Sequence, residues 1–467
     1  MLSMVIGAFF AILNETLLNI ALTTLMKEFG VSVTTVQWMA TGFMLVMGIV
    51  IPASALLTQW FTTRQMFLGT MIIFTLGTAI CAIAPNFPVL VAGRLLQAVG
   101  TGLLMPIIFN TFLLIYPPHR RGAVMGVVGL VIMFAPAIGP TLSGVIVQHL
   151  GWRYLFITVI PFAVFSILFA FKFLRNVGEV TKPKIDFISL IFSTIGFGAL
   201  IYGFSSVGAK EKGFLDPVVD IFIAVGLIAI VLFALRQLKS DSPFMDLRVF
   251  RYPMYRLGVL LFVLIIMLMF ASEIVLPLYM QGPLALTASA AGLVLLPGSI
   301  LNGMLSPVMG KLFDKFGPRP LMIPATIVLV LMMFAFSRLG TATSIGYITV
   351  CYLLLMVSIS AIMMPAQTNG LNELPKSLYP HGTAVMSTLQ PVGGAIGVSV
   401  FISIMNARQA KVLETKDTAE PAMVIHAMVA GVELVYFIGI ALAILAVIIA
   451  LFIKRAKPAI EQTSEKA

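Results

Sequence analysis

Long apolar stretches alternate with short polar connections along the whole chain. Each apolar stretch is about 20 residues long, the length of a helix that crosses the hydrocarbon core of a bilayer. The stretches lack the strict alternation of polar and apolar residues that is typical of strands. The pattern therefore predicts an all-α, polytopic membrane protein with fourteen transmembrane helices, at residues 3–25, 37–59, 66–84, 88–115, 122–147, 153–174, 186–207, 217–237, 255–281, 290–312, 319–338, 344–372, 382–406 and 431–453.

The connections between these helices predict how the chain is divided. The longest inner connections lie near residues 172–186 and 237–255, and they separate six helices, two helices and six helices. Two six-helix halves that repeat each other are a transporter architecture, with the substrate site between them. We expect an N-terminal six-helix bundle at 1–180, two extra helices with linkers at 181–250, a C-terminal six-helix bundle at 251–455 and a cytoplasmic tail at 456–467.

Composition and charge placement agree with this topology. The 467 residues are 60% hydrophobic and 10% charged, a balance that would expose too much apolar surface in a soluble domain. With the N-terminus inside, the inner connections carry more than twice as many Lys and Arg residues as the outer ones, which predicts that both termini are cytoplasmic. The net charge of +11 therefore reflects helix orientation, and we expect no nucleic-acid partner.

Residue types that carry cofactor chemistry are sparse. Cys81 and Cys351 fall inside apolar stretches, where we expect buried thiols, and the four histidines stand in loops or at span ends without metal-ligand spacing. The sequence has no G-x-x-x-x-G-K-[ST] loop for a nucleotide. We therefore expect no enzyme activity, no cofactor and no metal, and a proton gradient as the energy source.

The first predicted helix carries polar residues in its middle, among them Glu15. A carboxylate at that depth costs at least about 2.5–3.5 kcal/mol, so it should face a protein interior or a wet cavity. We interpret Glu15 as part of a proton or cation pathway. The alternative is that Glu15 pairs with Arg94 and locks the first helix to the fourth.

Two further charged residues lie within predicted spans. Glu273 is in the ninth helix, which opens the second half as the first helix opens the first, so both acids would lie on equivalent cavity helices. The alternative for Glu273 is an interfacial position near the outer surface. Arg94 is either coupled to the acid or a structural hub that bonds to carbonyl groups and Gln97.

Other carboxylates have simpler interpretations. Asp186 and Asp220 stand at predicted helix starts, where a carboxylate favours the helix dipole, so we expect structural roles. Glu433 begins the last predicted helix on the outer side, where we expect it to be solvated.

Some polar, aromatic and methionine side chains within the spans are candidates to line a substrate cavity. Methionine adapts its shape easily, which suits a pocket that binds varied apolar compounds. The alternative is that these side chains hold helices together. The candidates are Asn14, Asn19, Gln97, Phe43, Met47, Met267, Phe270 and Gln390.

The loop between the tenth and eleventh helices has a specific pattern, Gly310-Lys-Leu-Phe-Asp314-Lys315-Phe-Gly317-Pro-Arg319. Gly310 allows two helices to approach closely, and Asp314 is placed to accept hydrogen bonds from the N-terminus of a neighbouring helix. Lys315 and Arg319 would hold the loop inside. The pattern resembles the G-x-L-x-D-[KR]-x-G-x-[KR] loop signature of the major facilitator superfamily; the alternative is an ordinary basic inner loop.

The resemblance extends over the other spans. The fourth helix, with Arg94 and Gln97, is similar to the superfamily's fourth-helix motif, and the stretch 13–22, LNETLLNIAL, resembles the first-helix motif of fourteen-span drug:proton antiporters, the EmrB/QacA and lincomycin-resistance group. The fifth helix resembles the superfamily's antiporter motif, in Pro136, Gly139, Pro140 and Gly144.

This resemblance implies a function. It implies a proton-coupled multidrug efflux antiporter of the bacterial plasma (inner) membrane that exports amphipathic, often cationic, compounds by alternating access. Its partners would be the small-molecule substrate, protons and the lipid bilayer. We expect a monomer, and a need for an adaptor protein stays open. The alternatives are an exporter of a lipid or a specific metabolite and, in another class, a non-transporting membrane receptor.

The chain also departs from the family pattern. The first-half counterpart of the loop signature, residues 55–64, has neither its glycine nor its aspartate, which puts a latch there in doubt. The family's first-helix aspartate aligns with Asn14, and Glu15 stands beside it, turned by about 100° around the helix. Pro140 replaces a usual glycine. Substrate identity and proton stoichiometry stay open.

Overall fold

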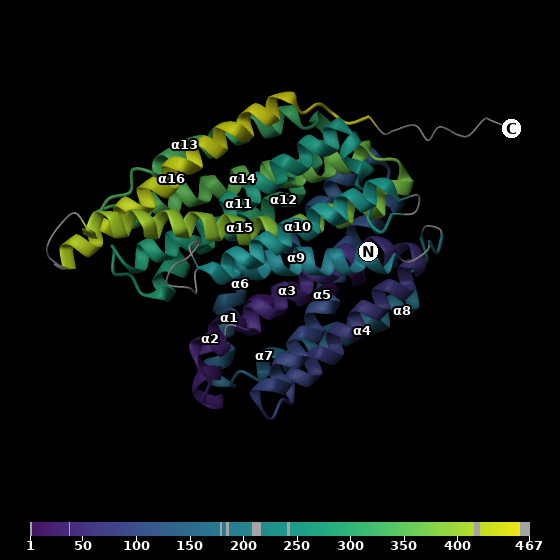
Figure 1. Cartoon of the computed structure of the whole chain (residues 1–467), viewed down its shortest axis with the longest axis horizontal. Coiled ribbons are helices and arrows are strands. Elements are labelled where there is room, and N and C mark those ends of the chain that lie inside the picture. Colours follow the sequence, from purple (N-terminus) through teal and green to yellow (C-terminus); the bar gives the residue numbers. More distant parts are fainter. Residues whose placement is uncertain are drawn as a thin grey trace.

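The computed structural model describes residues 2–36, 38–177, 180–183, 186–207, 216–240, 243–414 and 421–457. All regular elements in these ranges are helical (Figure 1), as predicted. Among the short ones are α2 (Val33–Val36), η1 (Pro118–Arg120), η3 (Leu247–Arg251) and η4 (Lys376–Leu378). The others are α1 (Leu2–Phe29), α3 (Trp38–Trp60), α4 (Thr63–Ala82), α5 (Phe87–Ile115), α6 (Arg121–His149), α7 (Tyr154–Ile157), α8 (Ile160–Phe173), α9 (Phe187–Val207), α10 (Pro217–Lys239), α11 (Pro253–Gln281), α12 (Ala288–Phe316), α13 (Arg319–Phe336), α14 (Ile345–Glu373), α15 (Tyr379–Glu414) and α16 (Pro421–Phe452).

Within the described residues, twelve helices are long and apolar enough to cross a membrane, with α7 and α8 counted together. Helices α1 and α6 have 28 and 29 residues, and some of their side chains lie outside the described part, including those of Asn19 and Pro140. The buried thiols expected at Cys81 and Cys351 are confirmed.

Three predicted spans differ in detail from the observed helices. The span predicted at 153–174 is interrupted at Thr158, because Pro161 has no amide hydrogen and its ring excludes the helical carbonyl four residues earlier. The last two spans are shorter in the prediction than in the structure. Helices α15 and α16 continue into the polar outer segment and have 36 and 32 residues.

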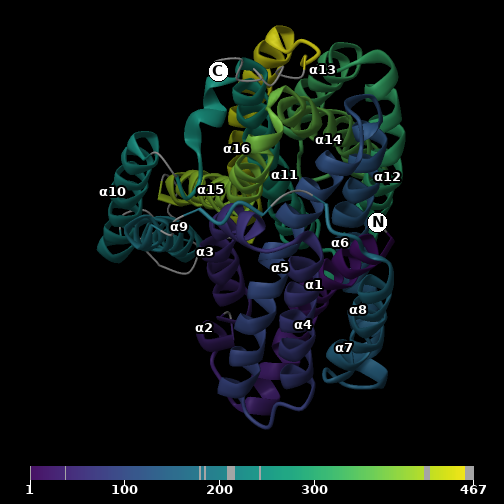
Figure 2. The ribbon, with the colours of Figure 1, turned by 90° about the vertical axis from the view of Figure 1, so that its right-hand side faces the viewer.

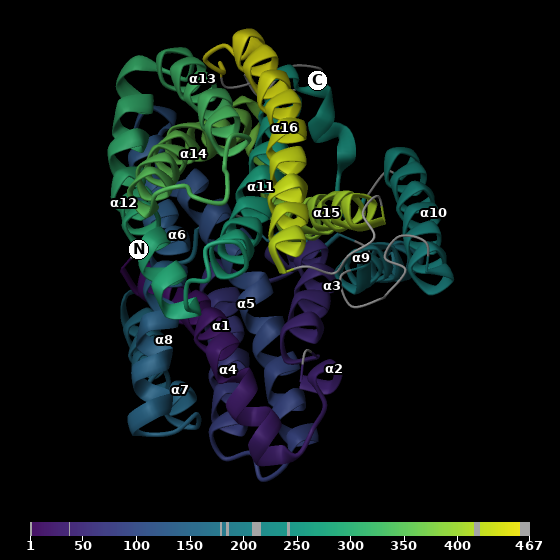
Figure 3. The same cartoon turned by 90° about the vertical axis from the view of Figure 1, so that its left-hand side faces the viewer.

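The long helices form two bundles. Figures 2 and 3 show α1–α5 with α7 and α8 in one bundle and α11–α16 in a second. Helix α6 packs on α1 of the first bundle and on α12 of the second, and α3 packs on α15. The bundles therefore meet along two seams, α6–α12 and α3–α15. The start of α1 and the end of α16 lie toward the same end of the molecule (Figure 1), which we call the inner end.

Backbone contact characterises the α6–α12 seam. A Cβ atom at Gly310 would lie 1.9 Å from the carbonyl oxygen of Gly122, and one at Gly126 would lie 2.4 Å from that of Ser306. No side chain fits between the two backbones at these points.

Helices α9 and α10 form a hairpin beside the two bundles (Figure 2). Helix α9 packs on α3 of the first bundle and on α15 of the second, and the Ser399 hydroxyl of α15 donates to the Phe204 carbonyl of α9 at 2.5 Å. The hairpin therefore covers the α3–α15 seam.

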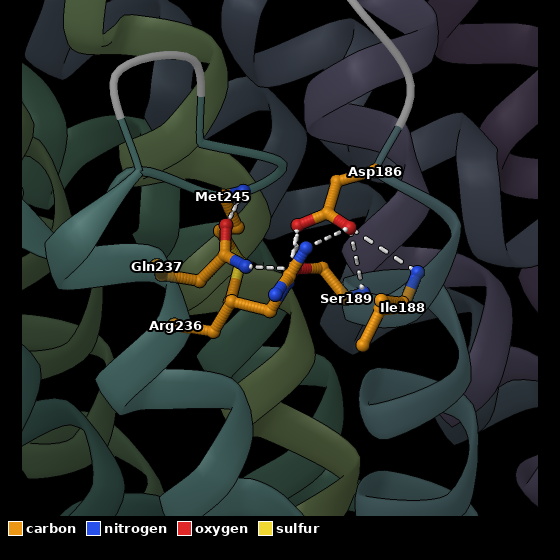
Figure 4. A network of polar contacts seen from close by, with 6 residues as sticks. All are labelled: Asp186, Ile188, Ser189, Arg236, Gln237 and Met245. Carbon is orange, nitrogen blue, oxygen red and sulfur yellow. Dashed lines mark hydrogen bonds and ion pairs between the residues drawn. The ribbon is translucent and has the colours of Figure 1, made fainter.

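A polar network closes the inner end of this hairpin (Figure 4). The Asp186 carboxylate accepts from Arg236 Nε at 2.7 Å and Nη2 at 3.0 Å, and it caps α9 by accepting from the backbone N–H of Ile188. Gln237 donates to the Ser189 hydroxyl at 2.6 Å. The hydrogen bonds from Arg236 lower the pKa of Asp186 to about 2. The structural role expected for Asp186 is confirmed.

The lowered pKa of Asp186 predicts a pH dependence for the stability that it contributes. This contribution is complete above the unfolded-state pKa of about 3.9 and is lost as the pH falls toward about 2. The difference in melting temperature between the natural chain and Asp186→Asn should be constant from about pH 5 to 8 and should shrink below about pH 4. A difference that varies between pH 5 and 8 would contradict this assignment.

The α6–α12 contact predicts a large effect of one methyl group. Gly310→Ala should force the helices apart and lower the free energy of unfolding by about 1–3 kcal/mol, as overpacking does. Gly292→Ala is the matched control, because it lies in the same helix and its Cβ would meet nothing within 4 Å. Thermal unfolding in detergent measures both; equal melting temperatures would refute the close contact.

Candidate substrate and proton site

Arg94 is the hub of a buried network in the first bundle. Its guanidinium, 2% exposed, donates from Nη1 to Asn14 Oδ1 at 3.1 Å and to Gln97 Oε1 at 3.0 Å. Gln97 in turn donates to the Thr78 hydroxyl at 2.8 Å. The Phe43 ring covers the cation, with 4.3 Å between its centroid and Cζ. Helices α1, α3, α4 and α5 all contribute to this network.

Glu15 has a different environment from its neighbour Asn14. It lies near the middle of α1 and is partly exposed. Among the described residues it has no hydrogen-bond or ion-pair partner, although the charge of Arg94 acts on it. One residue along a helix turns the side chain by about 100°, so Asn14 meets Arg94 while Glu15 faces another direction. The pairing alternative for Glu15 is not seen in this conformation.

The α6 motif lies against α1 at the residue after Glu15. A Cβ at Gly139 would lie 2.3 Å from the Thr16 hydroxyl oxygen, and the Ser143 hydroxyl donates to the Leu17 carbonyl at 2.5 Å. Of the other motif residues, Pro136 is partly exposed and Gly144 faces open space. The motif thus sets the contact of α6 with the helix that carries the acid.

Glu273 is the corresponding acid of the second bundle. It is exposed, eight residues before the end of α11, and its charge acts on Tyr352 of α14. The Tyr352 hydroxyl lies 3.3 Å from that of Ser299 on α12. Glu15 lies 14 residues before the end of α1. The two acids therefore occupy different positions along their helices, and the equivalence of α1 and α11 stays a prediction.

The cavity candidates separate into two groups. Asn14, Gln97 and Phe43 are buried in the Arg94 network. The others are partly exposed and remain available to line a cavity between the bundles: Met47, Met267, Phe270 and Gln390. A Cβ at Gly394 would lie 3.1 Å from the Phe270 ring, so α15 packs closely on this part of α11.

Asp314 joins the two bundles at the inner end. Its Oδ1 accepts from the backbone N–H of Gly122 and its Oδ2 from that of Ala123, both at 2.8 Å. These donors belong to the first turn of α6, so the carboxylate meets the positive end of the helix dipole, as the loop pattern predicts. Its role in conformational change stays a prediction.

The remaining residues of this loop fix its shape. Gly317 has a φ of +83°, which favours glycine. Arg319 donates from Nε to the Ile453 carbonyl at 3.0 Å, which ties the loop to the end of α16. Lys315 is exposed, with its ammonium 5.1 Å from the centroid of the Phe316 ring.

The first-half counterpart of this loop contacts the other bundle in a different way. Gln59 donates to the Ala55 carbonyl at 2.8 Å, and its amide nitrogen lies 3.3 Å from Nε2 of His381, in the first turn of α15. At the inner end of the α3–α15 seam, the contact is therefore between the Gln59 amide and the His381 imidazole. At the α6–α12 seam, it is between the Asp314 carboxylate and the N-terminus of α6.

Arg121 is a cross-bundle residue that the sequence reasoning missed. It directly precedes the span predicted at 122–147 and therefore belongs to an inner connection in the prediction, but it is 4% exposed and is the first residue of α6. It donates to Asn372 Oδ1 of α14 at 2.9 Å and to the Leu113 carbonyl at 2.6 Å. Its place directly before a long apolar stretch was the available signal.

The structure has two bundles of long apolar helices that are joined by polar contacts at the inner end. Each bundle carries an acid that is not fully buried, Glu15 or Glu273. This combination defines a membrane transporter. The chain belongs to the Major Facilitator Superfamily, whose family profile matches residues 4–398. It is a transporter of this family and not an enzyme.

Known relatives extend this assignment. The chain is 50% identical over 458 residues to lincomycin resistance protein LmrB of Bacillus subtilis, covering 98% of this chain and 96% of the relative. It is 28% identical to the multidrug resistance protein B homolog of Mycobacterium tuberculosis, covering 85% and 74%. The solved structure of the proton:xylose symporter XylE, at 14% identity, covers 97% of this chain and 95% of its own with a TM-score of 0.63, which shows the fold alone.

The Arg94 network predicts that Asn14 contributes to stability. Asn14→Ala removes an acceptor from a buried cation, which should lower the free energy of unfolding by about 1.5–3 kcal/mol. Ser54→Ala is the control, because Ser54 is equally buried and its hydroxyl has no partner among the described residues. Chemical unfolding in detergent compares the two; equal losses would contradict the role given to Asn14.

Proposed function

We propose that this chain is a proton-coupled multidrug efflux antiporter that exports amphipathic, often cationic, compounds. The observation that carries the proposal is Glu15, a partly exposed carboxylate in the middle of α1 with no partner in the described part of the chain. Arg94 donates to Asn14 and Gln97 instead. Glu15 is therefore available to hold either a proton or the positive charge of a substrate. The names of the relatives support drug efflux.

We propose fourteen spans in a 6 + 2 + 6 arrangement, made of the twelve apolar helices together with α1 and α6. The excess of basic residues in the inner connections supports cytoplasmic termini, in a bacterial plasma membrane. With this orientation, Asp314, Arg121 and Gln59 join the bundles on the cytoplasmic side, so the conformation is outward-facing.

The mechanism follows from competition at Glu15. In the outward-facing state a proton from outside neutralises the carboxylate, and a bound cation loses its counter-charge and leaves. A neutral Glu15 also reduces the cost of enclosing the site when the outer side closes. Separation of the cytoplasmic contacts then opens the site inward, where the proton leaves and the next cation binds. Glu273 would assist from the second bundle.

An exporter of a lipid or a specific metabolite is the alternative. The partly exposed cavity candidates Met47, Met267 and Phe270 are apolar and would also accept an uncharged chain. Competition among chemically different substrates separates the two, because a specific exporter would reject most of them. A non-transporting receptor would have no reason to carry the cost of intramembrane charges.

Efflux of a fluorescent lipophilic cation from proteoliposomes, with and without an imposed proton gradient, tests the proposal. The natural chain should require the gradient. Glu15→Gln should reduce gradient-driven efflux by at least about tenfold, because the amide cannot release a proton or neutralise a cation. Glu433→Gln, an exposed acid of α16, is the control and should leave efflux unchanged. Normal efflux by folded Glu15→Gln would remove this residue from the mechanism.

A further inference from the structure

The α9–α10 hairpin is bound to both bundles by the chain segments on either side of it. The entering segment, 180–183, is bound to the end of α3. The backbone N–H groups of Thr181 and Lys182 donate to the Gln59 carbonyl at 3.0 and 3.2 Å. The Trp60 indole N–H donates to the Pro183 carbonyl at 2.9 Å. This segment therefore belongs mechanically to the first bundle.

The leaving segment, 243–246, is bound to the second bundle. The backbone N–H of Asp246 donates to Nδ1 of His381, in the first turn of α15, at 3.0 Å. Phe244 and Met245 are buried, with the Phe244 ring 6.2 Å from that of Phe233 in α10. Movement of α15 at the inner end must therefore pull on the end of α10.

The network of Figure 4 connects these two segments. Asp186, three residues after Pro183, holds Arg236 through two hydrogen bonds. The next residue, Gln237, holds the Met245 N–H at 3.0 Å, one residue before the segment meets His381. A continuous path of chain and hydrogen bonds thus runs from the first bundle, through the inner end of the hairpin, to the second bundle.

The direct polar contact across the α3–α15 seam, between Gln59 and His381, is weak compared with the Asp314 contact across the α6–α12 seam. Because Nδ1 of His381 accepts from Asp246, the ring proton lies on Nε2. Nε2 faces the amide nitrogen of Gln59, another donor. The other seam has a carboxylate with two N–H donors. The Gln59–His381 contact at the inner end of the α3–α15 seam is therefore weaker than the Asp314 contact at the α6–α12 seam.

We propose that Asp186, Arg236 and Gln237 form a tether that joins the two bundles across the α3–α15 seam and limits how far their inner ends separate. These are positioning residues, and none of them belongs to the proposed proton site. The inference rests on the proposed rocking of the bundles, but it does not depend on proton coupling or on the substrate.

Distances between two spin labels test the tether in the full chain. Labels on cysteines at the exposed positions Phe61 and Ser377 span the seam, after replacement of the buried Cys81 and Cys351 by alanine. Arg236→Ala should raise the fraction of molecules with long distances about two- to fivefold, as expected for a partly exposed ion pair. Gln237→Leu should act in the same direction and serves as the second variant.

Two controls separate a tether from general loosening. The charge-reversed pair, Asp186→Arg with Arg236→Asp, should restore the short distances. Asp220→Asn changes an exposed acid at the other end of the same hairpin and should have no effect. A second label pair at the exposed His119 and Lys311, across the α6–α12 seam, should not respond to any of these variants.

The decisive outcome is the distance distribution across the α3–α15 seam. If it stays unchanged in both Arg236→Ala and Gln237→Leu, the tether is refuted, even if the melting temperature falls. Equal widening of the distance distributions at both seams would also refute the tether, because a general loss of folding would then be the cause. The proposed efflux function is tested separately at Glu15, so either proposal can fail without the other.

Discussion

The contact between α6 and α12 determines how the two bundles are related. Gly122 and Gly310 bring the backbones together without any side chain between them. The Asp314 carboxylate, beside them, takes up the first N–H groups of α6. Each feature depends on the other: the carboxylate reaches these donors only because the helices are so close. The polar contacts of Arg121 are built around the same helix start.

A second constraint is the cost of charge inside the membrane. Arg94 is held by the neutral amides of Asn14 and Gln97 and by an aromatic ring. These contacts keep the cation in place without fixing the protonation state of the nearby Glu15. Glu15 therefore experiences the field of the cation without being bound to it. Such an arrangement separates the structural contacts of the arginine from the proton exchange that we propose for the carboxylate.

The sequence allowed the fold to be predicted well because the bilayer imposes a simple rule: each span needs an apolar stretch of a given length. It also located Asp314, since a loop motif is a local pattern. It did not reveal that Asn14 rather than Glu15 meets Arg94, because that depends on the rotation of α1 against α5. It also left Arg121 outside the span predicted at 122–147, since burial by the other bundle has no local signature. The polar contacts of α9 and α10 were equally hard to predict, because they join residues far apart in the chain.

Helices α15 and α16 are about 54 and 48 Å long at 1.5 Å per residue, whereas a hydrocarbon core is about 30 Å thick. They pack against each other up to the outer boundary of their predicted spans, where a Cβ at Gly431 would lie 2.8 Å from the Met405 carbonyl, and both helices continue past this point. This paired extension makes the second bundle a lever with one long arm. A modest tilt of the bundle moves the far end of the pair through a much larger arc than the cavity itself. In the proposed orientation, this long arm lies on the outer side of the membrane.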